Sequence, residues 1–198
     1  MTRRHDNLRI DGARLWASLM AMHAIGATPR GGNDRQALTA LDGEARALFR
    51  RWCEASGATV TVDALGNQTA RRPGRRDDLP PVVVGSHLDT QPTGGKFDGV
   101  TGVLAGLELL RTLAAHDITT DHPIEVVNWT NEEGCRFAPA MLASGVYAGV
   151  YDQDWALART DRDGVAFEDA LDAIGARGAE ACAPRPMKAF LELHIEQG

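Results

Sequence analysis

Side chains that bind metal ions gather in three short stretches of the sequence, each at the end of an apolar run. His87, Asp89 and Asp98 follow the first run, Glu132 and Glu133 follow the second, and His194 with Glu196 stands at the third. Imidazole and carboxylate groups form the usual ligand set for zinc, manganese and similar divalent ions. Several carboxylates also suit two ions that share a bridging carboxylate and activate water for hydrolysis. The sequence therefore predicts a metal site with hydrolytic chemistry.

The spacing within the first stretch is compatible with one shared site. His87 and Asp89 are two residues apart, so both point to one side if the strand geometry continues. A carboxylate in that place can accept the second ring N–H of a histidine that binds metal. Asp98 stands at an expected helix start, and the glycines around it allow the backbone to bend back towards the strand end.

The two glutamates of the second stretch are adjacent and therefore point in different directions. One of Glu132 and Glu133 could bind metal while the other transfers protons. Taken alone, an aspartate at a helix start is usually a cap, and adjacent glutamates are usually solvated. A charged pair directly after a buried strand needs a further reason, and all three strand ends carry such residues. The joint pattern favours a functional site over three unrelated surface features.

Other catalytic motifs fit the sequence poorly. The GGK tripeptide resembles part of a phosphate-binding loop, but Thr90 replaces its first glycine and Phe97 its serine or threonine. Ser144 lacks the preceding glycine of a nucleophile elbow. Cys135, close to the glutamate pair, is expected to be a small packing residue near the site rather than a nucleophile.

Hydrophobic periodicity predicts an α/β domain with a mixed sheet. Helices are expected over residues 8–25, 41–55, 100–113, 139–144 and 169–174, the last with a start nearer 167 left open. Strands are expected over residues 58–62, 68–72, 81–85, 124–129 and 188–195. The runs at 81–85 and 124–129 are typical of strands buried on both faces. Sites in open α/β sheets form at the carboxyl ends of strands, where the polar stretches fall.

The composition narrows the classes of protein that fit. The chain has 198 residues, of which 43% are hydrophobic and 24% charged, and a net charge of -6, which argues against a nucleic-acid partner. Its three widely spaced cysteines do not suggest a disulfide framework and favour a reducing compartment. The first residues lack the apolar core of a signal peptide, and no apolar run approaches the roughly 20 residues of a membrane span. A cytoplasmic protein without membrane contact is expected.

Three long segments carry a resemblance to a known family: GSHLDTQPTGGKFDGVTGVLAGLE, NWTNEEGCRF and ELHIEQG. They closely resemble the family of N-carbamoyl-L-amino-acid hydrolase, β-alanine synthase and allantoate amidohydrolase. Its members are dinuclear-metal amidohydrolases related to aminoacylase and carboxypeptidase G-type peptidases. The stretches GG(x)nR at Gly31 to Arg35 and D-x-x-GN at Asp63 to Asn67 fit the same family. The resemblance implies a zinc-peptidase-like catalytic domain, with a mixed sheet and helices on both faces.

The resemblance implies two divalent metal ions and four ligands for them. Zinc is the first expectation, with manganese, cobalt or nickel as alternatives. His87 and His194 correspond to ligands of one ion, and Glu133 corresponds to a ligand of the second. Asp98 corresponds to the carboxylate that bridges both ions.

The resemblance also implies the reaction and the residues that support it. Glu132 corresponds to the general base that takes a proton from the bridging water. Asp89 corresponds to the carboxylate that orients His87, and Gln197 to a residue near the substrate. The implied reaction is hydrolysis of a carbamoyl or ureido C–N bond in a small molecule, which releases ammonia and carbon dioxide and leaves an amino acid or a ureido acid.

The sequence departs from the family at its end. Family members continue after the HIEQG strand with a lid and dimerisation domain and a return to the catalytic domain, which carries a last histidine ligand. Residues 1–198 are therefore expected to form the N-terminal part of an incomplete catalytic domain, with an exposed sheet edge and weak or no activity. Two alternatives stay open: a related dinuclear aminoacylase or peptidase, and a non-catalytic metal-binding fragment. The family is homodimeric, but the region that dimerises is missing here.

Overall fold

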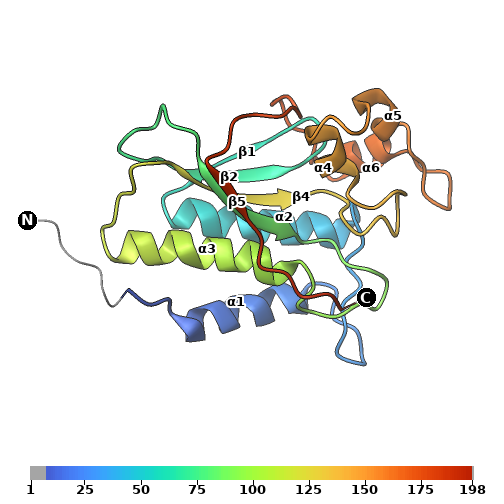
Figure 1. Ribbon diagram of the computed structural model, residues 1–198. Coiled ribbons are helices and arrows are strands. Elements are labelled where there is room, and N and C mark those ends of the chain that lie inside the picture. Colours follow the sequence, from blue (N-terminus) through green and yellow to red (C-terminus); the bar gives the residue numbers. More distant parts are fainter. Residues whose placement is uncertain (1–7, 198) are drawn as a thin grey trace, which may run out of the picture.

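The computed structural model describes residues 8–197 and confirms the predicted α/β class with a mixed sheet (Figure 1). The helices are α1 (Gly12–Ala24), α2 (Ala40–Ala55), α3 (Val100–Ala115), α4 (Leu142–Tyr147), α5 (Gln153–Leu157) and α6 (Phe167–Ala173). The strands are β1 (Thr59–Val62), β2 (Gln68–Arg72), β3 (Val82–His87), β4 (Ile124–Trp129) and β5 (Ala189–Leu191). Their order is β1-β2-β4-β3-β5. The β1–β2 and β2–β4 pairs are antiparallel, whereas β3 is parallel to both β4 and β5.

Helices α1, α2 and α3 cover one face of the sheet (Figure 1). α2 contacts β1 and β2, α3 contacts β3 and β4, and α1 packs on the outside of α3. The core between these layers holds fully buried side chains such as Phe49, Leu104, Leu107 and Val126. Each such side chain stabilises the fold by about 1.5–3 kcal/mol through its removal from water. The dense packing of α3 against β3 and β4 fixes the position of the loops at their carboxyl ends.

The opposite face of the sheet is covered more sparsely. Tyr147 of α4 packs on Trp129 with ring centroids 5.1 Å apart, and an irregular segment, residues 176–187, crosses the sheet from β1 towards β3. Glu125 of β4 points to this face, is fully buried, and accepts hydrogen bonds of 2.7 Å from both Arg71 and Arg185. Helices therefore lie on both faces of the sheet. On this second face, however, α4 covers only the carboxyl end of the strands.

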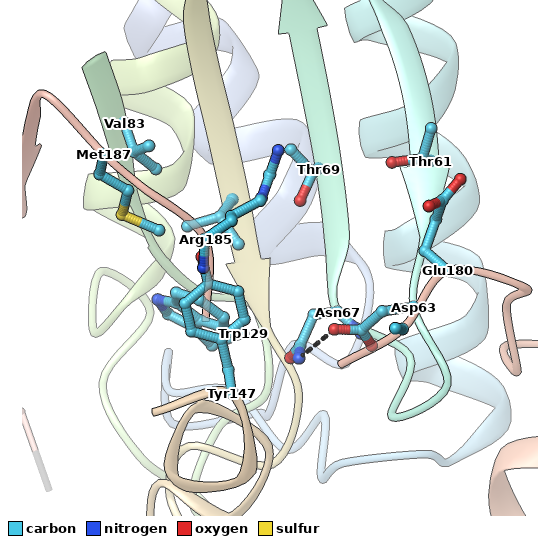
Figure 2. Close-up of a pocket in the computed structure, with 12 residues that line it drawn as sticks. Thr61, Asp63, Asn67, Thr69, Val83, Trp129, Tyr147, Glu180, Arg185 and Met187 are labelled. Carbon is cyan, nitrogen blue, oxygen red and sulfur yellow. Dashed lines mark hydrogen bonds between the residues drawn. The ribbon is translucent and has the colours of Figure 1, made fainter. Parts of the chain in front are cut away.

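A cavity of about 110 Å³ lies under the crossing segment, and Figure 2 shows the residues that line it. Its walls come from all of β1 to β4, from Tyr147 of α4 and from residues 180–187, and they include none of the predicted metal-site residues. This cavity therefore shares no residue with the predicted metal site.

The structure corrects the bounds of several predicted elements. β3 continues to His87, because its parallel pairing with β4 extends to the partners His87 and Trp129. The strand predicted over 188–195 is reduced to β5, since it pairs with β3 at the sheet edge through three residues and then leaves the sheet. α4 begins at Leu142 rather than at 139, after Met141 with a left-handed φ of 54°.

The structure also contains one helix that was not predicted. α5 has five residues, too few for a clear hydrophobic period. None of the helices in residues 8–197 has the length and apolar character needed to cross a membrane.

Candidate metal centre

Three predicted ligands from three separate segments meet at the carboxyl end of β3. Donor atoms of His87, Asp98 and His194 all lie within 4.8 Å of one another. His87 Nε2 lies 3.7 Å from Asp98 Oδ1 and 3.5 Å from His194 Nε2, and the latter atom is 3.4 Å from Asp98 Oδ1. Ligand atoms about 2.0–2.1 Å from a tetrahedral zinc ion are roughly 3.3 Å apart, so these separations suit one shared ion.

The ring of His87 is held in a defined orientation. Its Nδ1 lies 2.8 Å from the main-chain oxygen of Asp89, which can only accept, so Nδ1 carries the hydrogen. In the neutral ring this leaves the lone pair on Nε2, which faces Asp98 and His194. Burial lowers the pKa of His87, but the nearby carboxylates, Asp89 and Glu132 first among them, raise it more, and the pKa is raised overall.

Gly99 is required where the loop turns into α3. Its φ is +61°, a left-handed conformation that side chains rarely adopt, and a Cβ placed there would overlap the ring of His87. The absence of a side chain lets Asp98, the preceding residue, approach the strand end, as the sequence predicts.

Asp89 is placed differently from the expectation. Its carboxylate Oδ1 is 3.9 Å from His87 Nδ1, too far for a hydrogen bond, and it is the main-chain oxygen that orients the ring. The carboxylate instead accepts hydrogen bonds from the main-chain nitrogens of Glu132 and Glu133, both at 3.2 Å. Side chains at i and i+2 share a side only within a strand, and β3 ends at His87. Asp89 thereby links the loop after β3 to the loop after β4.

The two glutamates point to different parts of the site, as predicted. Glu132 Oε2 lies 3.4 Å from His87 Nε2, so this carboxylate faces the His–Asp cluster. Glu133 is outside the cluster, and its side chain is hydrogen-bonded to Gln91. Burial raises the pKa of Glu132, and burial together with the charges of Asp98 and Asp89 raises the pKa of Glu133 to about 7. This surplus of carboxylates around two histidines suits the binding of cations.

His194 and Gln197 lie in the irregular segment after β5. The side chain of His194 is 32% exposed, and Gln197 is exposed as well. The main-chain nitrogen of Gln197 donates to Asp98 Oδ2 at 2.8 Å, and its side-chain oxygen accepts from Phe97 N at 3.0 Å. Gln197 is therefore held against the metal-site loop. A contact between Gln197 and substrate stays a prediction.

Two motifs that were noted for the resemblance alone turn out to support the site. In the D-x-x-GN stretch, Asp63 binds the side chain of Asn67 at 2.8 Å (Figure 2), and Asn67 accepts from Thr130 N at 2.9 Å, just before the two glutamates. In the GG(x)nR stretch, the buried Arg35 donates to the main-chain oxygen of Leu88 at 2.9 Å. The contacts of Asn67 with Thr130 and of Arg35 with Leu88 could not be inferred from residue types, because each joins segments more than 50 residues apart.

Comparison with known proteins identifies the family of the chain. Residues 83–198, more than half of the chain, match the model of peptidase family M20/M25/M40. The chain belongs to this family. It is also similar to an N-carbamoyl-L-amino-acid amidohydrolase of Rhizobium meliloti, with 56% identity over 98% of this chain and 46% of that protein. A more distant M20 relative is a ureidoglycolate hydrolase of Arabidopsis thaliana, with 32% identity over 98% of this chain and 42% of that protein.

Solved structures show the same M20-type fold. A hydantoinase/carbamoylase family amidase from Burkholderia multivorans has 57% sequence identity and a TM-score of 0.94, over 95% of this chain and 46% of that one. The chain thus spans a little under half the length of the relatives that it matches. By sequence and by fold, it is a member of the M20 family.

Proposed function

We propose that this chain carries the water-activating metal centre of an amidohydrolase that cleaves the C–N bond of N-carbamoyl-L-amino acids or related ureido acids. The convergence of His87, Asp98 and His194, with Glu132 beside them, is the observation that carries the proposal. The substrate class is supported by relatives named N-carbamoyl-L-amino-acid amidohydrolase and ureidoglycolate hydrolase. Allantoate is a further candidate of the same chemical class.

The candidate ligands divide between two ions in this proposal. His87, Asp98 and His194 would hold the first ion, since their donor atoms have the mutual spacing that one ion needs. Asp98 would bridge to a second ion held by Glu133, whose carboxylate lies close enough for the charge of Asp98 to raise its pKa. We expect zinc, with manganese, cobalt or nickel as alternatives. Bound there, the ions would polarise the carbamoyl oxygen and lower the pKa of a bound water.

Glu132 would act as the base and then as the acid. Its carboxylate faces the cluster at 3.4 Å from His87 Nε2, within reach of a water placed there. Burial raises its pKa, and a raised pKa suits a group that accepts a proton and later returns it to the leaving nitrogen. Asp89 would keep His87 and the main chain of Glu132 in place, and Gln197 would lie beside the substrate.

We further propose that residues 1–198 are one part of a larger catalytic unit. The M20 relatives are about twice as long, and the remaining length would supply a further histidine ligand, a substrate lid and a dimer contact. On this proposal the 198-residue chain alone binds at most one ion tightly and turns over little or no substrate. A cytoplasmic location stays a prediction.

The proposal is tested on the protein encoded by the complete reading frame, assayed with N-carbamoyl-L-amino acids, N-acetyl-L-amino acids and dipeptides. We expect hydrolysis of the N-carbamoyl compounds. The Glu132→Gln variant should retain its metal content and lose activity by roughly 10²–10⁴-fold. Faster cleavage of dipeptides would instead favour a peptidase, the activity for which the family is named, and faster cleavage of acetyl amino acids would favour a deacylase.

The 198-residue chain is measured in parallel for metal content and hydrolysis. Two tightly bound ions with turnover would contradict the proposal that it is an incomplete unit. A complete protein with bound metal but no hydrolysis of any of these substrates would contradict the enzymatic proposal and favour a metal-binding role.

A further inference from the structure

We propose that Arg35 is a positioning residue of the candidate metal centre. It fixes the loop after β3 and the loop after β4 relative to each other, because it holds the residues on either side of Asp89. Arg35 belongs to the GG(x)nR stretch, which the proposed reaction does not use. Its positioning role rests on the proposed function only in treating this centre as catalytic.

The guanidinium of Arg35 is buried, with 1% of the residue exposed. Its Nη1 donates to the main-chain oxygens of Met22 at 3.1 Å and Ile25 at 2.6 Å, which lie at the carboxyl end of α1. Its Nε donates to the oxygen of Leu88 at 2.9 Å. One side chain thus ties the end of a helix to the residue between His87 and Asp89, and the positive charge is favourable at a helix carboxyl end.

The main chain of Arg35 holds the other neighbour of Asp89. Arg35 N donates to Thr90 Oγ1 at 2.8 Å, and Thr90 N donates to Arg35 O at 3.0 Å. Thr90 is itself 1% exposed, so these bonds are shielded from water. Asp89 therefore stands between two residues that are each bound to Arg35.

Asp89 is the residue whose position matters to both loops. Its main-chain oxygen accepts from His87, and its carboxylate accepts from the main-chain nitrogens of Glu132 and Glu133. A shift of Asp89 would rotate the His87 ring and release the glutamate loop at the same time. Metal ligands and general bases lose function when their supporting residues move by about 1 Å.

Arginine suits this position better than lysine. Its planar group donates in several fixed directions, whereas a lysine ammonium is one point at the end of a flexible stem. Burial lowers the pKa of Arg35 to about 10, so the group remains charged at neutral pH. Without its donors, the oxygen of Leu88 would lose its hydrogen bond from Arg35, and the oxygens of Met22 and Ile25 would each lose one of their donors.

The test uses amide hydrogen exchange on the metal-free 198-residue chain. In Arg35→Met, the amides of Glu132 and Glu133 should exchange at least about ten-fold faster relative to the amide of Val126 in central β4. Arg35→Lys should give an intermediate increase of about three-fold. If Arg35 only stabilised the fold as a whole, its replacement would raise the exchange rates of all three amides by the same factor.

Arg14→Met is the matched control. Arg14 also holds α1, through hydrogen bonds of 2.9 and 2.7 Å to the buried Glu108, but it does not touch residues 88–90. This variant should leave the exchange ratio unchanged. A ratio in Arg35→Met that equals the ratio in Arg14→Met would overturn the proposal.

Should Arg35→Met fail to fold, Thr90→Val removes the Oγ1 acceptor and leaves the helix contacts of Arg35 intact. The same ratio should then rise by about two- to three-fold, and an unchanged ratio would overturn the proposal. Titration with Co²⁺, followed by its visible absorption, gives a second readout, with binding at least about ten-fold weaker in Arg35→Met or Arg35→Lys than in Arg14→Met. A parent chain that binds no Co²⁺ would contradict the proposed function but leave the exchange test valid.

Discussion

The two histidines of the metal centre lie in very different surroundings. His87 ends a strand that pairs on both sides, is fully buried, and has its ring oriented by the main chain of Asp89. His194 lies beyond the three-residue edge strand β5, and its side chain is 32% exposed. The fold thus builds one half of the centre rigidly. It holds the other half, residues 192–197, by contacts such as those of Gln197 to the metal-site loop.

The largest expected effect comes from breaking the rigid half at Gly99. Gly99→Ala should lower the free energy of unfolding by about 3 kcal/mol, because the methyl group meets the His87 ring and the φ of +61° is strained. Urea unfolding of the metal-free chain measures this. Gly149→Ala is the control, because Gly149 has a φ of +74° but open space around it, and should cost only about 1 kcal/mol. Equal costs for the two variants would remove the argument for a contact between Gly99 and His87.

The next prediction compares the loss of stability when His87 or His194 is replaced by alanine. Without metal, His87→Ala should cost about 2 kcal/mol of stability, because it empties a buried position and leaves the Asp89 oxygen unpaired. His194→Ala should cost less than about 0.5 kcal/mol at its exposed position. Urea unfolding compares both with His116→Ala, an exposed histidine at the end of α3.

The two histidines should contribute equally to the stabilisation that metal provides. Zinc at about 100 times its dissociation constant should stabilise the parent chain by roughly 2.7 kcal/mol. Both histidine variants should lose this gain, whereas His116→Ala should keep it. A His194→Ala variant that retains the full gain would exclude His194 as a ligand.

A smaller effect on stability is expected from the protonation of Glu133 in the metal-free chain, where no ion binds its carboxylate. Burial raises its pKa from 4.5 to about 7, so the folded state holds this proton more tightly than the unfolded state. Stability should therefore fall as the pH rises from about 4.5 to 7, by about 1 kcal/mol for this half-buried group after solvent screening. Glu133→Gln should flatten that slope, as followed by urea unfolding in the presence of a chelator. An identical slope in both proteins would contradict the pKa shift.

A small effect, like that of His194→Ala, is expected for Gln197 in the exposed half. Gln197→Ala removes one hydrogen bond to Phe97 N but keeps the main-chain bond to Asp98, so the cost should be about 0.5 kcal/mol. Thermal unfolding should show a shift within a few degrees. A loss of stability as large as that of His87→Ala would mean that residues 192–197 are held as firmly as the carboxyl end of β3.

Much of the fold and of the candidate site could be predicted from local sequence. The strands at 68–72 and 124–129 were predicted with the observed bounds. The Gly66-Asn67 turn marks the start of the first strand, and the second is a largely apolar run followed by a polar loop. The cluster of His87, Asp98 and His194 was expected, since polar residues at the carboxyl ends of parallel strands share one edge of the sheet. The extent of β5 was not predictable, because it depends on the strand partners at the edge.

The sequence by itself determined which side chains could bind metal, which elements would carry them, and the family. These are properties of local patterns and of long motifs. Only the tertiary structure decided that Asp89 orients His87 through its main chain, that its carboxylate holds the glutamate loop, and that Arg35 lies behind it. The physical reason is that buried polar groups must find partners, and the identity of a partner depends on how distant segments pack.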